Sequence, residues 1–263
     1  MTNNPYQGQQ LRCADIHLEL HGSRILNGVD FALSPRELVG ILGSNGAGKS
    51  SLLKSIVGIH KPSSGQIRLG DRGLATLAPR HQAQSIAYLA QGQQAHWPQT
   101  VEKVVMLGRI PHVRHPAQDA RIAGMVMEQV GITHLRQRNV ETLSGGERAR
   151  TLLARALAVQ APVLLADEPL AALDPAHQLR IMQLLQEQAR QGLAVAVVLH
   201  DLALAMRFCS RIVVLHEGKK IADGEPHIAC SDQNLAQAFG IDVARASWGG
   251  GSFAVPWSTR ESV

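Results

Sequence analysis

The chain has 263 residues, of which 45% are hydrophobic and 18% are charged, and its formal net charge is +5. This composition is typical of a folded globular protein with one large domain or two small ones. Its longest apolar runs, such as 193–199, are far shorter than the roughly 18–20 residues that span a bilayer. Aromatic residues make up only 3% and no basic run is present, so we do not expect nucleic-acid binding.

The first ten residues lack the basic and apolar regions of a secretion signal, so we expect a cytoplasmic location. Cys13, Cys209 and Cys230 are scattered along the chain and form no C-x-x-C pair. This spacing argues against a disulfide framework or a zinc site, and it favours reduced, buried thiols.

In chain order, short strands come first and a long helical stretch follows them. Residues 16–20 alternate in hydropathy, and 37–42 form a continuous apolar run that ends at a glycine loop and a helix. The stretch from about 97 to 139 has helical patterns and no convincing strand. Strand and helix then alternate again, which predicts a mostly parallel sheet with helices on both faces. The further predicted strands are 25–33, 66–70, 85–90, 162–167, 193–199 and 211–215, and predicted helices begin at 144, 174 and after 201, whereas 247–263 shows little pattern.

Residues 43–50, GSNGAGKS, fit the phosphate-binding pattern G-x-x-x-x-G-K-[ST] without a gap. Glycines allow successive backbone N–H groups to turn toward a phosphate chain, and the start of the following helix favours its negative charge. Lys49 is expected to reach the β- and γ-phosphates and Ser50 to ligate Mg²⁺. The candidate ATP-binding residues in this loop are Gly43, Ser44, Asn45, Gly46, Ala47, Gly48, Lys49, Ser50 and Ser51.

Two acidic residues end the buried strand VLLADE. Asp167 is placed to hold the hydration shell of Mg²⁺, and Glu168, one residue further, is placed to act as a general base on the attacking water. Glu168 could instead be a helix-capping partner. Asp174 precedes Pro175, as a helix N-cap does, and a role as a cap alone is the alternative to a functional one. His200 follows another buried strand, where spacing alone favours a structural role.

The segment ETLSGGERAR, 141–150, combines a capping box with two glycines. Ser144 and Glu147 have the S-x-x-E spacing in which a hydroxyl and a carboxylate satisfy free N–H groups at a helix start. A capping box does not need Gly145 and Gly146, and glycine in a helix costs about 1 kcal/mol relative to alanine. The glycines therefore predict close approach of a phosphate to this helix start.

These motifs occur together and in order, and over nearly its whole length the chain resembles an ATPase subunit of an ABC transporter. The resemblance rests on the loop 43–50, LSGGE at 143–147, VLLADE at 163–168, ALD at 172–174 and a glutamine after a strand. It implies a P-loop NTPase core with an N-terminal antiparallel β-subdomain and an inserted α-helical subdomain. The implied division is 11–95 and 160–245 for the core with the β-subdomain, and 96–159 for the helices with LSGGE, within one domain of 1–263.

The resemblance also implies roles that spacing does not show. Gln91 would contact Mg²⁺ and the attacking water, and His200 would contact the γ-phosphate. Asp174 and the signature residues Ser144–Glu147 would face the ATP of a second copy. Such ATPases usually stack adenine on an aromatic residue, commonly tyrosine, at the position where this chain has His21. The resemblance therefore makes His21 a candidate ATP-binding residue, and the imidazole in place of the aromatic ring is a departure from the family pattern.

Residues 104–112, VVMLGRIPH, are similar to the G-R-Y-P-H segment of importers for iron-siderophores, haem and cobalamin, with Ile110 in the tyrosine's place. The resemblance implies an ATP- and Mg²⁺-dependent homodimer on the cytoplasmic face of the membrane, docked on two permease subunits near 92–125 and served indirectly by an extracytoplasmic binding protein. An importer of another substrate class, a soluble ABC ATPase of repair or translation, and a P-loop kinase are the alternatives. A kinase would leave LSGGE and Glu168 unexplained.

Overall fold

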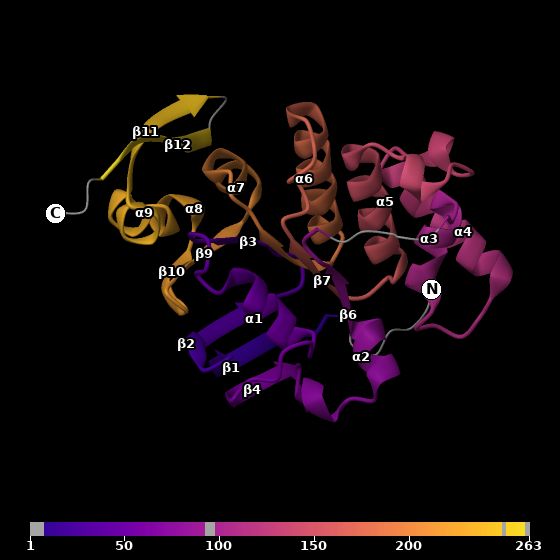
Figure 1. The fold of residues 1–263 in the computed structure, drawn as a ribbon, viewed down its shortest axis with the longest axis horizontal. Coiled ribbons are helices and arrows are strands. Elements are labelled where there is room, and N and C mark those ends of the chain that lie inside the picture. The colour runs from indigo at the N-terminus through magenta and orange to yellow at the C-terminus, as the bar shows by residue number, and fades with distance from the viewer. Residues whose placement is uncertain (1–7, 93–97, 249–250, 261–263) are drawn as a thin grey trace.

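A computed structural model describes residues 8–92, 98–248 and 251–260. Its centre is a six-stranded sheet in the order β10-β9-β3-β8-β7-β6 (Figure 1). The neighbours β9/β3, β3/β8, β8/β7 and β7/β6 are parallel, and only the edge strand β10 runs antiparallel to β9 among the described strands. The mostly parallel sheet predicted from the sequence is confirmed. The strands are β3 (Leu38–Leu42), β6 (Ile86–Leu89), β7 (Val163–Asp167), β8 (Ala194–Val198), β9 (Arg211–His216) and β10 (Lys219–Gly224).

The central strands are apolar on both faces because both faces are covered. In β7, Leu164 and Ala166 belong to a buried cluster with α6 (Pro175–Arg190) and α7 (Leu202–Phe208). Val163 and Leu165, which point the other way, belong to a second cluster with α1 (Lys49–Ile56) and the N-terminal strands. One face is thus covered by helices, and the other is shared by α1 and a second sheet rather than covered by helices alone.

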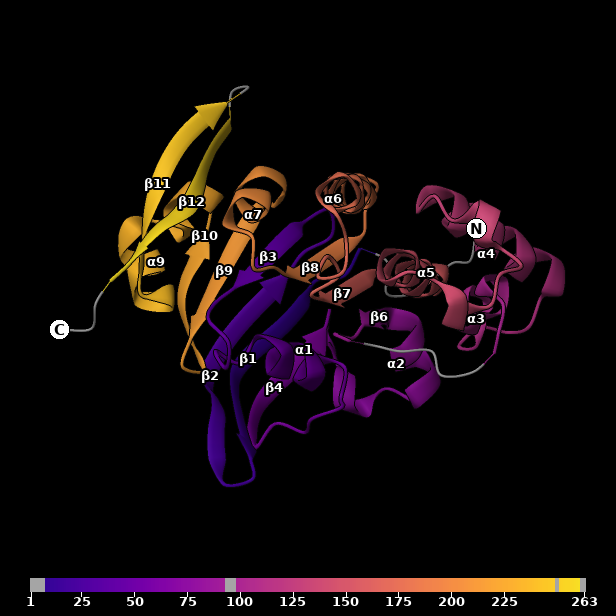
Figure 2. The same ribbon diagram turned by 45° about the horizontal axis from the view of Figure 1, so that its top comes forward.

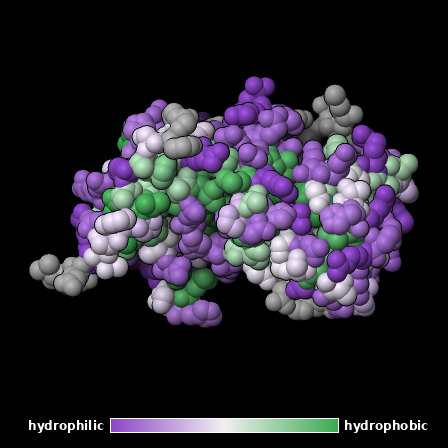
Figure 3. Space-filling view, turned by 90° about the horizontal axis from the view of Figure 1, so that it is seen from above, coloured by the Kyte–Doolittle hydropathy of each residue, from purple (hydrophilic) through white to green (hydrophobic). Residues whose placement is uncertain are grey.

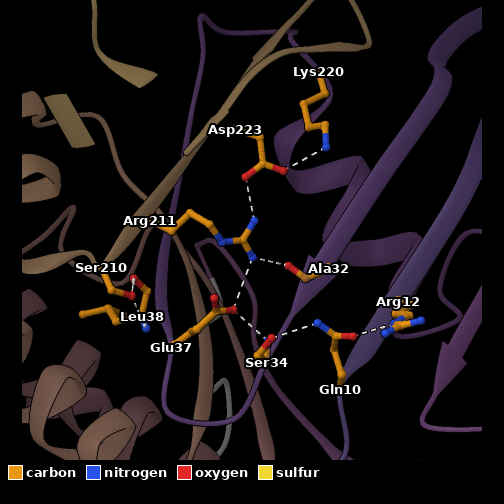
Figure 4. A network of polar contacts seen from close by, with 10 residues as sticks. All are labelled: Gln10, Arg12, Ala32, Ser34, Glu37, Leu38, Ser210, Arg211, Lys220 and Asp223. Atoms are coloured by element: carbon orange, nitrogen blue, oxygen red, sulfur yellow. Dashed lines mark hydrogen bonds and ion pairs between the residues drawn. The ribbon is translucent and has the colours of Figure 1, made fainter. Parts of the chain in front are cut away.

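The N-terminal strands form an antiparallel sheet, as the family resemblance implies, in the order β2-β1-β4-β5. It consists of β1 (Leu11–Leu20), β2 (Ser23–Leu33), β4 (Ser64–Leu69) and β5 (Arg72–Gly73). Arg211 at the start of β9 joins this sheet to the central one (Figure 4): its guanidinium donates to the Ala32 carbonyl and pairs with Glu37 at 3.3 Å and with Asp223 at 2.6 Å. These contacts hold the two sheets together at the end away from the glycine loop.

A group of helices lies at one end of the molecule (Figures 1 and 2). The predicted helical character of the stretch up to Asn139 is confirmed from residue 98 onward, where the one strand-like pairing is a bridge between Thr100 and Asn139. Residues 93–97 lie outside the described residues. The group consists of α3 (Val101–Met106), η2 (Leu107–Arg109), α4 (Pro116–Gln129), η3 (Thr133–Leu135), η4 (Val140–Thr142) and α5 (Gly145–Ala158).

The carboxyl-terminal region has more structure than its sequence pattern indicated. Residues 247–263 show little pattern in the sequence, but β11 (Ile241–Trp248) and β12 (Gly251–Thr259) form a hairpin at the end opposite the helical group (Figure 2). The hairpin packs on neighbouring helices and buries Ala254 completely, so it is stabilised by contacts distant in sequence. The sequence also gave no signal for η1 (Leu74–Thr76), α2 (Pro79–Ser85), α8 (Pro226–Ala229) and α9 (Asp232–Phe239).

Most of the surface seen from above is hydrophilic, with hydrophobic residues in smaller separate areas (Figure 3). Among the described residues, no helix combines the length and the hydropathy of a membrane span. All three cysteines are free and buried, as predicted.

Candidate functional site

The glycine loop joins the end of β3 to the start of α1, as the change of period predicts. Gly43 has φ +149°, and a Cβ there would lie 2.3 Å from the Leu215 carbonyl oxygen. Gly48 is the N-cap of α1 with φ +99°, and a Cβ there would lie 2.8 Å from Leu26 Cδ2. Both positions require glycine for reasons internal to the chain. Since Gly48 has no side chain to cap the helix, the first N–H groups of α1 are left for another group.

Lys49, the first residue of α1, is 6% exposed and lies against the loop backbone. Its Nζ donates to the carbonyl oxygens of Gly43 at 2.7 Å and Ser44 at 2.9 Å. Burial lowers the pKa of Lys49, while Glu168 and Asp167 act to raise it. An ammonium has three N–H donors, so this geometry leaves one for a ligand in the loop.

Asp167, at the end of β7, is held by side chains from two other elements. Ser50 Oγ donates to Asp167 Oδ1 at 2.9 Å, and Tyr88 of β6 donates from its hydroxyl to Oδ2 at 3.3 Å. Burial raises the pKa of the Asp167 carboxyl, and the Ser50 hydrogen bond partly offsets that effect. The predicted neighbours Ser50 and Asp167 therefore meet. Tyr88 was not predicted, because nothing in SIAYLA marks one strand residue as facing a carboxylate.

Glu168 and His200, from the ends of two adjacent strands, are in direct contact. His200 Nε2 lies 2.7 Å from Glu168 Oε1, and the Glu168 side chain is 15% exposed. The backbone of Glu168 has φ +52°, a conformation that is uncommon for a residue other than glycine and often occurs at functional sites. The contact joins two residues that are far apart in the sequence and that no sequence pattern connects.

A cavity of about 410 Å³ lies over the start of α1. Gln91, which follows β6, and Glu168 line it together with the loop, although they come from separate parts of the sequence. Ile25 of β2 lines it too, which the sequence analysis did not anticipate. His21, in contrast, is exposed at the turn between β1 and β2 and is not among the residues that line this cavity. The other lining residues are Asn45, Gly46, Ala47, Gly48, Lys49, Ser50 and Ser51.

These residues fit a nucleotide phosphate chain and a magnesium ion. The cavity is polar on its loop side, carries a buried lysine, and has a volume within the range of small-molecule sites. Ser50 Oγ and Asp167 are hard oxygen donors, and Mg²⁺ in nucleotide sites is typically held by one or two such groups together with phosphate oxygens. Among the described residues there is no cluster of three or more His, Cys, Asp or Glu that could hold a metal without such a ligand.

The signature segment begins α5, and its capping box is formed. Glu147 N donates to Ser144 Oγ at 3.3 Å, and Ser144 N donates to Glu147 Oε2 at 2.8 Å. A Cβ on Gly145 would lie 3.5 Å from Ala172 Cβ, and one on Gly146 would lie 3.4 Å from Leu173 Cδ2, which are ordinary contact distances. Neither glycine has positive φ, so packing within the chain does not require them.

Asp174 is the N-cap of α6, as its position before Pro175 predicts. Its Oδ1 accepts from the His177 N–H at 2.9 Å, and its Oδ2 lies 2.7 Å from His177 Nδ1. The hydrogen bond from the His177 N–H lowers the pKa of Asp174. Asp174 and the residues Ser144–Glu147 are all described, and none of them lines the cavity over α1.

Comparisons with known proteins identify the family of the chain. The sequence profile of the ABC transporter family matches residues 26–171. The hemin import ATP-binding protein HmuV of Pseudomonas fluorescens is 40% identical over 238 residues, which cover 89% of this chain and 93% of the relative.

Two solved structures show the same fold. A metal-chelate type ABC transporter in an inward-facing conformation matches with a TM-score of 0.82 and 25% identity over 95% of this chain and 98% of its own. A dimeric bacterial ABC transporter cassette matches with a TM-score of 0.75 and 25% identity over 82% of this chain and 98% of its own. The glycine loop, the contact between Glu168 and His200 and these likenesses lead to one conclusion: the chain belongs to the ABC transporter family.

Proposed function

We propose that the chain is the ATP-hydrolysing subunit of an importer for a metal chelate, and that two copies work together. The observation that carries the proposal is the cavity of about 410 Å³, in which the phosphate-binding loop is joined by Gln91 and Glu168. The loop binds the phosphates, and the side chains of Gln91 and Glu168 provide polar groups that can orient and deprotonate a water molecule. The site therefore suits ATP hydrolysis rather than ATP binding alone.

In the proposed reaction, a water oxygen attacks the γ-phosphorus of ATP and the bond to the bridging oxygen breaks, giving ADP and phosphate. The N–H groups at the start of α1 and the Lys49 ammonium hold the phosphates. Glu168 accepts the proton of the attacking water, and Gln91 orients that water. His200 Nε2 lies 2.7 Å from Glu168 Oε1 and holds the carboxylate, and we propose that it also contacts the γ-phosphate.

Ser50 and Asp167 are the proposed residues for Mg²⁺, with Gln91 as a further polar contact. Mg²⁺, when bound, neutralises negative charge on the β- and γ-phosphates. Tyr88 fixes the orientation of the Asp167 carboxylate through its hydrogen bond to Oδ2. The exposed His21 is proposed only as a contact at the edge of the adenine site.

We propose that the signature glycines serve the nucleotide of a second copy. Gly145 and Gly146 are not required by packing within the chain, and they lie in the first turn of a helix whose amides can bind an anion. In the proposed dimer, the signature residues of one copy face the phosphates bound to the other copy, which gives the two glycines a role. The residues on this face are Ser144, Gly145, Gly146, Glu147 and Asp174. The likeness to a dimeric bacterial ABC transporter cassette supports the dimer in this proposal.

The segment 92–125, which follows Gln91, is proposed as the part that contacts the permease. Leu107, Ile110 and Val113 are 44%, 71% and 63% exposed, although all three are large and apolar. Large apolar side chains that are exposed close together on a surface mark an interaction site when they form one patch, and we propose that these three side chains belong to such a patch. We place the chain at the cytoplasmic face of a membrane, on two permease subunits that receive substrate from an extracytoplasmic binding protein. The core would then be 11–95 with 160–245.

The proposed cargo is a haem, cobalamin or iron-siderophore type of chelate. The likeness to a hemin import ATP-binding protein and to a metal-chelate type transporter supports this class, as does the GRIPH segment.

The test is to reconstitute the chain with its permease in liposomes and to measure uptake of haem, cobalamin and a ferric siderophore. We expect ATP-dependent uptake of one chelate class, which the Glu168→Gln variant abolishes while it still binds ATP. Uptake that continues in Glu168→Gln would contradict the catalytic assignment, and no uptake of any chelate with active ATPase would contradict the cargo class.

A further inference from the structure

The segment 107–113 has two different faces. Leu107, Ile110 and Val113 point to solvent, whereas Arg109 is 5% exposed and His112 is half-buried. The inward side chains are polar, which is unusual for a buried face, and buried polar groups need hydrogen-bond partners to be stable there.

The inward face contacts the carboxyl end of α5, the helix that begins at the signature segment. Arg109 Nη1 donates to the Ala158 carbonyl at 2.8 Å and to the Val159 carbonyl at 3.5 Å. His112 Nε2 lies 2.7 Å from the same Val159 carbonyl oxygen and donates to it. These carbonyls are at the negative end of α5, where they have no partner within the helix and where a cation is favoured.

Gly108 allows this contact to be close. A Cβ at Gly108 would lie 2.2 Å from the Arg155 carbonyl oxygen and 2.9 Å from Ala158 Cβ. The backbone of the segment therefore rests directly on the last turn of α5.

The segment is also fixed to two other elements. Arg109 Nε donates to Asp119 Oδ1 of α4 at 3.0 Å, and the second Asp119 oxygen accepts from the His115 N–H at 3.1 Å. The Pro111 carbonyl accepts from Arg80 Nε at 2.8 Å and from Gln84 Nε2 at 2.7 Å, both on α2. Helix α2 leads directly into β6 and Gln91, so the segment links α5 to the strand before the catalytic glutamine.

We propose that Arg109 and His112 are positioning residues that set where α5 lies along its axis, and thus where its first turn lies. We call Arg109 and His112, with their hydrogen bonds to the Ala158 and Val159 carbonyls, the clamp. Helix α5 has 14 residues, so at 1.5 Å per residue roughly 21 Å separate the clamp from Ser144. A helix transmits an axial displacement along its length because its backbone hydrogen bonds keep it rigid. This inference rests on the proposed function, in which that first turn meets the nucleotide of a second copy.

The same segment carries Leu107, Ile110 and Val113 on its outer face, so a displacement of that face would be transmitted to α5 through Arg109 and His112. The clamp therefore supplies a physical connection between the proposed permease contact and the signature residues. Neither clamp residue lines the nucleotide cavity, so neither is a catalytic residue.

The test uses ATP-dependent dimer formation in a Glu168→Gln background, measured by sedimentation, together with ATP binding by each variant at a concentration where it is monomeric. His112→Ala removes one clamp hydrogen bond at a half-buried position, and His112→Gln restores a donor at the place of Nε2. Arg109→Met combined with Asp119→Leu removes the remaining clamp contacts without leaving a buried charge unpaired, which keeps the fold testable. Arg180→Met, at an exposed position on α6, is the control for the loss of an arginine.

We expect His112→Ala and the double variant to need about tenfold more protein for half-dimerisation, with monomer ATP affinity and melting temperature within error of the parent. His112→Gln and Arg180→Met should dimerise as the parent does. Dimerisation of His112→Ala and of the double variant at the parent's concentration would overturn the positioning role alone. If the parent itself forms no dimer with ATP, the proposed function fails and the positioning role fails with it.

Discussion

Helices α1 and α5 both begin beside glycines, and these glycines differ in why they are needed. At the start of α1, Gly43 and Gly48 have positive φ, and a side chain at either would collide with the chain itself. At the start of α5, Gly145 and Gly146 have room for a Cβ, and a complete capping box already satisfies two N–H groups. The glycines at the first helix start are required by the backbone and packing of the chain itself, whereas those at the second are not, and we attribute them to the nucleotide of a second copy.

The largest expected effect concerns Glu168, the proposed general base beside the first helix. Glu168→Gln should lower ATP turnover by about 10²- to 10⁴-fold, because a general base contributes on that order. ATP affinity should be retained, since Lys49 and the loop amides are unchanged. Steady-state ATPase rates and nucleotide titration measure the two quantities. Turnover within a few-fold of the parent would exclude Glu168 as the base.

The second prediction tests the proposed shared site. Ser144→Arg should reduce ATPase activity to near background, because a long cation at the N-cap of α5 blocks approach of a second copy. It also removes the side-chain cap, which costs about 1 kcal/mol. Binding of ATP to the monomer should be unaffected, as Ser144 is not among the residues lining the cavity. A normal ATPase rate would show that one chain hydrolyses ATP alone.

Alanine at the two kinds of glycine provides the sharpest contrast. Gly48→Ala should destabilise the fold by at least about 1–2 kcal/mol, because alanine is disfavoured at φ +99°. Gly146→Ala should instead raise the melting temperature by about 1–2 °C, since alanine is the better helix former, and should lower ATPase activity by about tenfold. Differential scanning calorimetry and ATPase assays on the same samples separate these effects. A Gly146→Ala protein that is both more stable and fully active would remove the argument for an outside group.

A smaller effect is expected at Tyr88. Tyr88→Phe removes the hydroxyl that donates to Asp167 Oδ2 at 3.3 Å and leaves the ring in place. The Mg²⁺ concentration for half-maximal ATPase activity should rise by about tenfold, which is the usual scale for a group that orients a metal ligand. Tyr88→Leu serves as a comparison, because it loses the ring as well. An unchanged Mg²⁺ dependence in Tyr88→Phe would mean that the hydroxyl does not orient the carboxylate.

The smallest effect concerns pH and the buried pair of Arg109 and Asp119. Burial acts to raise the pKa of Asp119, but hydrogen bonds from Arg109 and from the His115 N–H outweigh it, and the pKa is lowered. A lowered folded-state pKa stabilises the protein above the ordinary value of about 3.9, and this stability is lost as the pH falls through the lowered pKa. As the pH falls from the ordinary pKa of Asp119 to its lowered pKa, the free energy of unfolding of the parent should therefore decrease more than that of the double variant Arg109→Met with Asp119→Leu. Urea unfolding at each pH measures both. Equal losses would contradict the shift.

The candidate site residues that could be predicted from the sequence are those whose motif lies within a few neighbouring residues. The loop 43–50, the strand end at Asp167 and the capping box at Ser144 are each contained within a few neighbouring residues, so spacing was enough to place them. Tyr88 could not be predicted, because its role depends on which strand lies beside β7. The pair of Arg109 with Asp119 was missed for a related reason: a segment that reads as a helix end stopped by proline gives no sign that its arginine turns inward.

The fold shows the same division. The parallel strands were predicted because they are continuous apolar runs, and their alternate residues indeed enter two separate cores. The hairpin 241–259 was missed because its strands are mostly exposed and depend on packing against α7 and α9. His21 remains a prediction from family position, since the cavity does not reach it.

The most direct test of the account is whether ATP joins two copies through the signature helix. Glu168→Gln protein should sediment as a monomer without nucleotide and as a dimer with ATP, whereas Glu168→Gln with Ser144→Arg should bind ATP equally well and remain a monomer. A Glu168→Gln protein that stays monomeric at saturating ATP, or a Ser144→Arg variant that dimerises as readily, would contradict the claim that the glycines of α5 serve the nucleotide of a second copy.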